Sequence, residues 1–140
     1  MVARFFGTYE HTLDAKGRLT LPARFRGPFD QGGFLSQNLD GCLALWTPDQ
    51  FERQMQDMEE REATGRAERN QARVWASNSH EVELDRQGRM AVPARLRGYA
   101  GLSENVLVIG VINRVEVWDP DRYQERVEPE EQRLAEGLED

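Results

Sequence analysis

A thirteen-residue phrase occurs twice in this chain. The first copy, DAKGRLTLPARFR, runs from Asp14 to Arg26, and the second, DRQGRMAVPARLR, runs from Asp85 to Arg97. Seven of the thirteen positions are identical, and the copies lie 71 residues apart. A second pair, LALWTPDQF from Leu43 and VEVWDPDRY from Val115, repeats at an offset of 72. We therefore predict two copies of one small module, related by a pseudo-twofold axis.

The length of the chain limits how independent the two copies can be. At 140 residues the chain has the size of one compact domain, and a half of about 70 residues is close to the lower limit for burying a core alone. We expect the halves to need each other. No apolar run approaches the roughly 20 residues that span a bilayer, and the N-terminus lacks the pattern of a signal peptide, so we expect a soluble protein with no membrane partner.

Local patterns in the first copy predict strands and a short helix. Residues 8–13 alternate and are rich in β-formers, Asp14–Gly17 supplies turn chemistry, and residues 18–21 return as a strand. This is the pattern of a β-hairpin. A short helix is expected at Pro22–Arg26, because proline suits the first helical position.

A longer helix is predicted after strands at 34–36 and 42–46. Thr47, Pro48 and Gln50 have the form of a capping box, and the helix that follows weakens at Thr64-Gly65 and resumes to about Trp75. Met55 and Met58 lie at helical spacing, which favours a place in the core over an adaptable binding face.

The second copy repeats this plan. Its predicted elements are strands at 81–84, 89–92, 106–111 and 114–118, a short helix at 93–97, and a helix from Pro120 to about Leu138. The run VLVIGVI at 106–112 is almost continuously apolar, which predicts a strand covered on both faces at the centre of the fold. Association with other subunits would hide the edges of such small sheets.

The residues that most often carry catalysis or bind metals are scarce. Cys42 is the only cysteine and has apolar neighbours, which predicts a buried, inert thiol. His11 and His80 have no second ligand at metal spacing and are expected on the surface or at a strand edge. The sequence offers no Ser/His/Asp set, phosphate-binding glycine loop or metal cluster, so we expect no enzyme activity, metal or cofactor.

Charge is distributed unevenly along the chain. The net charge is −7, which by itself argues against a nucleic-acid partner. Residues 1–28, however, carry five basic against two acidic side chains, whereas residues 119–140 carry nine acids against three arginines. We therefore predict a basic hairpin region and an acidic helical region.

The repeated phrase has a structural and a functional interpretation. Asp-x-x-Gly-Arg alone fits a tight turn, since Asp begins many turns and Gly accepts a positive φ. The arginines that continue both copies are not needed for a hairpin. Two copies of Leu-Asp-x-x-Gly-Arg-x-x-x-Pro-Ala-Arg-x-Arg, together with a Trp-Thr-Pro helix start, closely resemble the MraZ family, over nearly the whole chain.

The resemblance implies a fold and a function. MraZ proteins resemble the AbrB and SpoVT group of swapped-hairpin transcription factors, which implies an α+β fold of two tandem AbrB-like β-barrel halves about a pseudo-twofold axis, each followed by an α-helix. The halves would be residues 1–76 and 77–140. The implied partners are other copies of the chain, in a closed ring, and double-stranded DNA. The implied role is cytoplasmic and nucleoid-associated: binding tandem promoter repeats ahead of the division and cell-wall gene cluster, as a repressor.

Site residues follow from the matched motif. We expect Arg18 and Arg89 to donate to guanine O6 and N7 or to phosphate, because a guanidinium can fork two N–H groups onto either. Lys16, Arg4 and Arg86 are expected to attract phosphates. The residues expected to hold the two loops in shape are Asp14, Asp85, Gly17 and Gly88. For Arg24 and Arg26 a structural role and a DNA-binding role stay open.

An alternative function is an oligomeric scaffold. In that case the duplicated fold serves assembly, and the arginines form intersubunit salt bridges with the abundant acids. The net charge of −7 favours this interpretation.

Overall fold

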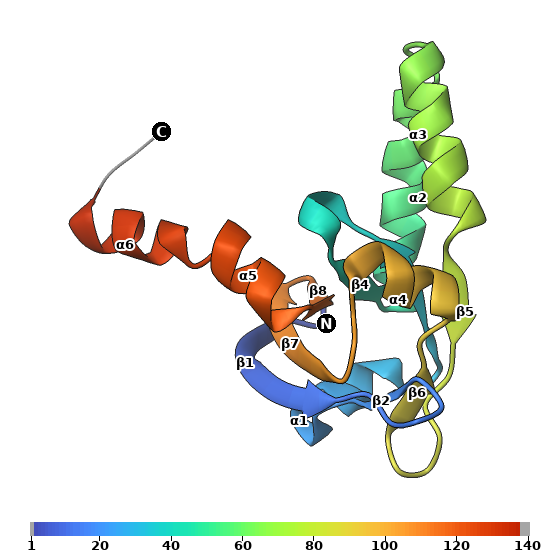
Figure 1. Ribbon diagram of the computed structural model, residues 1–140. Helices are drawn as coiled ribbons and strands as arrows, with labels where there is room; N and C mark the ends of the chain where they lie inside the picture. Colours follow the sequence, from blue (N-terminus) through green and yellow to red (C-terminus); the bar gives the residue numbers. More distant parts are fainter. Residues whose placement is uncertain (1, 138–140) are drawn as a thin grey trace.

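The computed structural model describes residues 2–137, so Leu138, the expected end of the last helix, lies outside the described residues. Figure 1 shows the arrangement of the chain. The strands are β1 (Phe5–Thr12), β2 (Arg18–Thr20), β3 (Gly33–Gln37), β4 (Leu43–Trp46), β5 (His80–Val82), β6 (Arg89–Ala91), β7 (Asn105–Ile112) and β8 (Arg114–Trp118). The helices are α1 (Ala23–Arg26), α2 (Pro48–Glu62), α3 (Arg66–Ser77), α4 (Ala94–Ala100), α5 (Pro120–Arg126) and α6 (Pro129–Glu136), with short 3-10 turns at Gly27–Phe29 and Leu39–Gly41.

The strands of residues 2–137 form two antiparallel units. One is a six-stranded sheet in the order β1-β7-β8-β4-β3-β5, and the other is the two-stranded β2–β6 ribbon. The predicted α+β class is confirmed. The predicted β-barrel halves are wrong, because the six-stranded sheet is open, with β1 and β5 at its edges. Strands of both repeats interleave in this sheet, so neither half curls into a barrel of its own.

Strand pairing between the repeats is symmetric. β1 pairs with β7, β2 with β6, β3 with β5 and β4 with β8, so each strand of the first repeat pairs with one of the second. The predicted β-hairpin of residues 8–13 with 18–21 is therefore wrong, because β1 and β2 lie in different sheets and the two segments share one isolated bridge, between Leu13 and Leu19. The order of the six-stranded sheet reads the same from either end when equivalent strands are exchanged. Two pairs of equivalent residues mark the axis, Leu19 opposite Met90 and Ala44 opposite Glu116.

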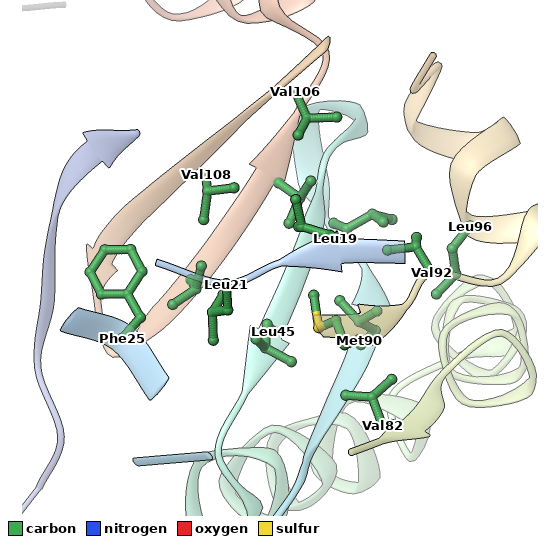
Figure 2. Packing of buried hydrophobic residues seen from close by; sticks show 14 of the residues in the cluster. Leu19, Leu21, Phe25, Leu45, Val82, Met90, Val92, Leu96, Val106 and Val108 are labelled. Atoms are coloured by element: carbon green, nitrogen blue, oxygen red, sulfur yellow. The ribbon is translucent and has the colours of Figure 1, made fainter. Parts of the chain in front are cut away.

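The ribbon lies over the main core. Its alternation turns Leu19, Leu21, Met90 and Val92 inward, and each of these side chains is at most 1% exposed. Figure 2 shows them in one cluster with side chains of the six-stranded sheet, such as Leu45. The core is therefore built jointly by both repeats.

The apolar strand β7 is covered on both faces, as predicted. Val106 and Val108 belong to the main core, whereas Ile109 packs on the opposite face with Cys42 and Trp118. β7 is not central, however. It lies second in the sheet, between β1 and β8, because the axis places β4 and β8 in the middle.

The long helix predicted for the first repeat is two helices, α2 and α3. Thr47 caps α2, since its Oγ1 accepts from the Gln50 amide at 3.3 Å. The predicted weak point at Thr64-Gly65 is the break between α2 and α3, and the chain reverses there into a helical hairpin (Figure 1). Phe51 near the start of α2 stacks on Trp75 near the end of α3, with ring centroids 5.1 Å apart.

The C-terminal helix is interrupted rather than continuous. α5 ends at Arg126, and α6 begins at Pro129. A proline ring inside a helix would clash with the carbonyl four residues earlier, so the predicted single helix from Pro120 cannot continue through this position.

Replacing Leu19 by alanine tests the ribbon's part in the core. Leu19 is fully buried, so Leu19→Ala is expected to lower the free energy of unfolding by about 2–5 kcal/mol. Leu39→Ala is the matched control, because Leu39 is 79% exposed and should change stability by less than about 0.5 kcal/mol. Urea denaturation at one protein concentration measures both. Equal effects would mean that the ribbon does not anchor the core.

Candidate nucleic-acid interface

The first loop is organised by one carboxylate. Asp14 Oδ1 accepts the amides of Lys16 and Arg18, each at 2.9 Å, and its Oδ2 accepts Nε of Arg18 at 2.7 Å. The Gly17 amide donates to the Asp14 carbonyl at 2.9 Å, with Gly17 at a φ of 74°. Such a φ favours glycine, which accounts for this residue in the turn.

The second loop has the same geometry. Asp85 Oδ1 accepts the amides of Gln87 and Arg89, each at 2.9 Å, and its Oδ2 accepts Nε of Arg89 at 2.8 Å. Gly88 has a φ of 80°. The difference between Lys16 and Gln87 leaves this pattern unchanged, because both residues contribute only a backbone amide.

Hydrogen bonds stabilise the charged form of both carboxylates. The amide of Arg18, followed by its guanidinium and the Lys16 amide, holds the pKa of Asp14 below its usual range. The amide of Arg89 does the same to the pKa of Asp85, together with the Arg89 guanidinium and the Gln87 amide. The two loops are therefore built around ionised carboxylates.

The side chains of the two motif arginines, Arg18 and Arg89, are each held through one nitrogen only. The Asp–Arg pairs use Nε, and within residues 2–137 the terminal nitrogens of Arg18 and Arg89 have no hydrogen-bond partner. Both side chains are 31% exposed. Each guanidinium is thus oriented by its carboxylate while its terminal N–H groups stay free for a ligand.

The ribbon brings the two arginines together. Arg18 lies opposite Ala91 and Arg89 lies opposite Thr20, so the arginines are diagonal neighbours. They lie on the outer face, because Leu19 and Met90 between them are buried. Diagonal neighbours in an antiparallel pair are about 7–8 Å apart. The sequence placed these residues in separate repeats, and the fold unites them on one surface.

The other predicted basic residues differ in position. Lys16 and Arg86 are exposed on the two loops, and their side chains have no partner among residues 2–137. Arg4 does not join them. It precedes β1, whereas Asp14 follows that strand, and eight strand residues correspond to roughly 26 Å of extended chain.

The structure separates the two arginines of each short helix. Arg26 Nε donates to the Leu21 carbonyl at 2.8 Å, and Arg97 Nη1 donates to the Val92 carbonyl. Both side chains are therefore partly structural. Arg24, like its equivalent Arg95, is exposed and has no side-chain partner in the described chain. All four arginines recur in the repeated phrases, so the sequence marked them as candidates. It could not distinguish the pair bound to carbonyls from the exposed pair.

Acidic residues concentrate away from the ribbon. Figure 1 shows α5 and α6 extending from β8 on the far side of the molecule from the β2 and β6 loops. These helices belong to the segment that carries most of the excess negative charge. The surface around Arg18 and Arg89 is consequently the more basic one.

Cys42, His11 and His80 lie where the sequence predicts them. Cys42 is 1% exposed, and burial raises the pKa of its thiol. His11 lies in β1 and His80 in β5, the two edge strands. Residues 2–137 contain no group of three or more His, Cys, Asp or Glu that could hold a metal ion. Within the same residues, no helix is long and apolar enough to span a membrane.

Two comparisons with known proteins indicate the same family. A family model described as "MraZ protein, putative antitoxin-like" matches residues 4–74 and again residues 76–139. A curated protein from a Nocardioides species, named "Transcriptional regulator MraZ", is 43% identical over 121 residues, which cover 86% of this chain and 84% of that protein. The resemblance carried by the two repeated phrases is confirmed.

The lowered carboxyl pKa values predict a pH dependence. A group whose pKa falls on folding stabilises the fold above its unfolded pKa, about 3.9 for aspartate, and loses that effect as the pH falls through the folded value. An Asp14→Asn, Asp85→Asn double variant should be less stable than the wild type near pH 7. Urea midpoints measured at one protein concentration should converge as the pH falls from about 4 toward 2. A difference between the urea midpoints of the wild type and the double variant that persists at the lowest pH would contradict stabilisation by the ionised carboxylates.

Proposed function

The chain belongs to the MraZ family, and we propose that it is a sequence-specific DNA-binding regulator of transcription. The name of its Nocardioides relative supports regulation of transcription. The arrangement of Arg18 and Arg89 supports DNA as the ligand, and it is the observation on which the proposal depends.

The geometry suits base recognition. Each arginine is fixed through Nε and keeps its terminal N–H groups free. A guanidinium in this state can donate two hydrogen bonds to O6 and N7 of guanine. The major groove of B-DNA, about 12 Å wide, admits a two-stranded β-ribbon, so the outer face of β2–β6 can present both side chains to base edges.

Contacts to the phosphates would fix the register. Lys16 and Arg86 flank the motif arginines on the exposed loops, where a basic side chain reaches the DNA backbone. Arg4 is too far along β1 to act with them, so a phosphate contact by Arg4 would require a second part of the duplex. The acidic helices α5 and α6 would repel DNA and leave the ribbon as the facing surface.

Repetition would raise the affinity. One chain offers only two motif arginines, and a good bidentate base contact contributes about 1–3 kcal/mol of discrimination. A closed ring that presents several ribbons to tandem promoter repeats would gain avidity without new contacts. Within the described chain, the sheet has two different open edges, β1 and β5. Contact between unlike surfaces of successive subunits produces rings when the rotation closes.

The proposed targets are the tandem repeats ahead of the division and cell-wall gene cluster, with repression as the outcome. Such a regulator would act in the cytoplasm, on the nucleoid. The scaffold alternative assigns the arginines to acids of neighbouring subunits. Asp14 and Asp85 already supply an acid to each motif arginine within its own loop, which favours the DNA interpretation.

Substituting the motif arginines tests the proposal. Fluorescence anisotropy with the duplex immediately upstream of the gene should show that Arg18→Ala and Arg89→Ala each weaken binding by roughly tenfold or more, because a base contact is lost. Arg69→Ala is the charge-matched control, since Arg69 is exposed on α3, away from the ribbon. It should bind like the wild type.

Light scattering distinguishes the scaffold alternative. The DNA proposal requires that the variants keep the oligomer size of the wild type. If Arg18→Ala dissociates the oligomer, or if the wild type does not bind the duplex, the DNA-binding proposal is wrong and the scaffold interpretation replaces it.

Lys16→Ala separates phosphate contacts from base contacts. Removing one phosphate contact from each bound subunit should reduce the slope of log affinity against log salt by about 0.9 for every subunit on the duplex, and weaken all sequences equally. Arg18→Ala should instead reduce the preference for the promoter duplex over a scrambled duplex. Titrations of both duplexes at several salt concentrations measure these effects. An unchanged slope would remove Lys16 from the interface.

A further inference from the structure

We propose that Arg26 and Arg97 are positioning residues that act crosswise, each holding the DNA-binding loop of the opposite repeat. Arg97, in the second repeat, would set the shape of the loop that carries Arg18. Arg26, in the first repeat, would set the loop that carries Arg89. This inference rests on the proposed DNA-binding function.

Arg97 contacts the first loop at Gly17, and we call this contact and its equivalent at Arg26 the two braces. Its Nη1 donates to the carbonyl of Val92, and the amide of Val92 donates to the carbonyl of Gly17 at 3.0 Å. The guanidinium also lies directly against Gly17, where a Cβ atom would collide with Nη1. Gly17 precedes Arg18 in the chain, so Arg97 contacts the loop one residue from the side chain that it positions.

Arg26 braces the second loop in the same way. Its Nε donates to the carbonyl of Leu21 at 2.8 Å, and the amide of Leu21 donates to the carbonyl of Gly88 at 2.8 Å. A Cβ atom at Gly88 would collide with Nε of Arg26. Gly88 immediately precedes Arg89, so the second brace reproduces the first with the repeats exchanged.

Both braces are anchored on buried residues. Leu21 and Val92 are at most 1% exposed, and Figure 2 shows their side chains in the main core. An arginine bound to a carbonyl that is fixed by the core can hold a surface loop in place. The planar guanidinium suits this position, because it carries several N–H donors and can contact a glycine while it donates to the carbonyl.

The two glycines therefore have a second function besides the turn. Each supplies a positive φ, and each leaves room for the guanidinium that crosses from the other repeat. The loop and its brace come from different repeats, so the expected coupling pairs Arg97 with Arg18 and Arg26 with Arg89. A purely local role would couple each arginine to the motif in its own repeat.

Hydrogen–deuterium exchange tests the braces without DNA. In Arg97→Ala, peptides covering residues 13–19 should exchange at least about threefold faster, while peptides covering residues 84–90 keep the wild-type rate. Arg26→Ala should give the opposite pattern. Each variant is the matched control of the other, because both remove one arginine from equivalent positions. Faster exchange in the loop of the same repeat, or in both loops equally, would overturn the proposal.

Double-mutant cycles test the consequence for DNA binding. Arg18→Ala should weaken binding on the order of tenfold in the wild type and in Arg26→Ala, but less than about threefold in Arg97→Ala. Arg89→Ala should lose its effect only in Arg26→Ala. Equal effects in all backgrounds would overturn the crossed coupling. If neither Arg18→Ala nor Arg89→Ala weakens binding in the wild type, the proposed function fails, and the exchange experiment alone decides the braces.

Lysine variants cover the case in which the alanine variants do not fold. Arg97→Lys and Arg26→Lys keep the charge but lack the planar guanidinium that contacts the glycine. They should show the same crossed exchange pattern with a smaller amplitude. Wild-type exchange in both loops of both lysine variants would contradict a positioning role.

Discussion

The pairing of β2 with β6 is the contact on which the rest of the structure depends. Leu19 and Met90 meet on the pseudo-twofold axis, and both are buried in the core that the two repeats share. The same register places Arg18 and Arg89 on the opposite, outer face. A shift of one residue would exchange the two faces, bury the arginines and expose the core side chains. Register, core and candidate DNA surface are thus set by one short pairing.

The sequence was most informative where structure is local. The tight turn at Asp14–Gly17, the Thr47 cap and the short helices depend on neighbouring residues, and the two repeated phrases made them visible. The strands on either side of that turn do not form the predicted hairpin, because each pairs with a strand of the other repeat. The Asp–Arg geometry within each loop is of the same kind. Membership of the MraZ family could also be predicted, because both copies of the motif are intact.

Pairing between distant residues was less predictable. A single sequence does not state that β1 lies beside β7 or that the sheet stays open, because backbone hydrogen bonds look alike in every register. The placement of Arg26 against Gly88 is equally hidden, since the partners are 62 residues apart. Reversal at Thr64-Gly65 brings Trp75 back onto Phe51, and this contact between distant residues cannot be predicted from helix propensity.

The pairing of Ala44 with Glu116 shows what fusing two copies into one chain makes possible. Had the module paired with an identical copy, each residue on the axis would face itself. Glu116 is 8% exposed and accepts hydrogen bonds from Asn38, Arg114 and Trp118. Two such carboxylates opposite each other would repel in a buried site. In a chain that contains both copies, the two residues that meet on the axis can differ. A buried acid, Glu116, can therefore lie on one side of the axis with the small Ala44 opposite it.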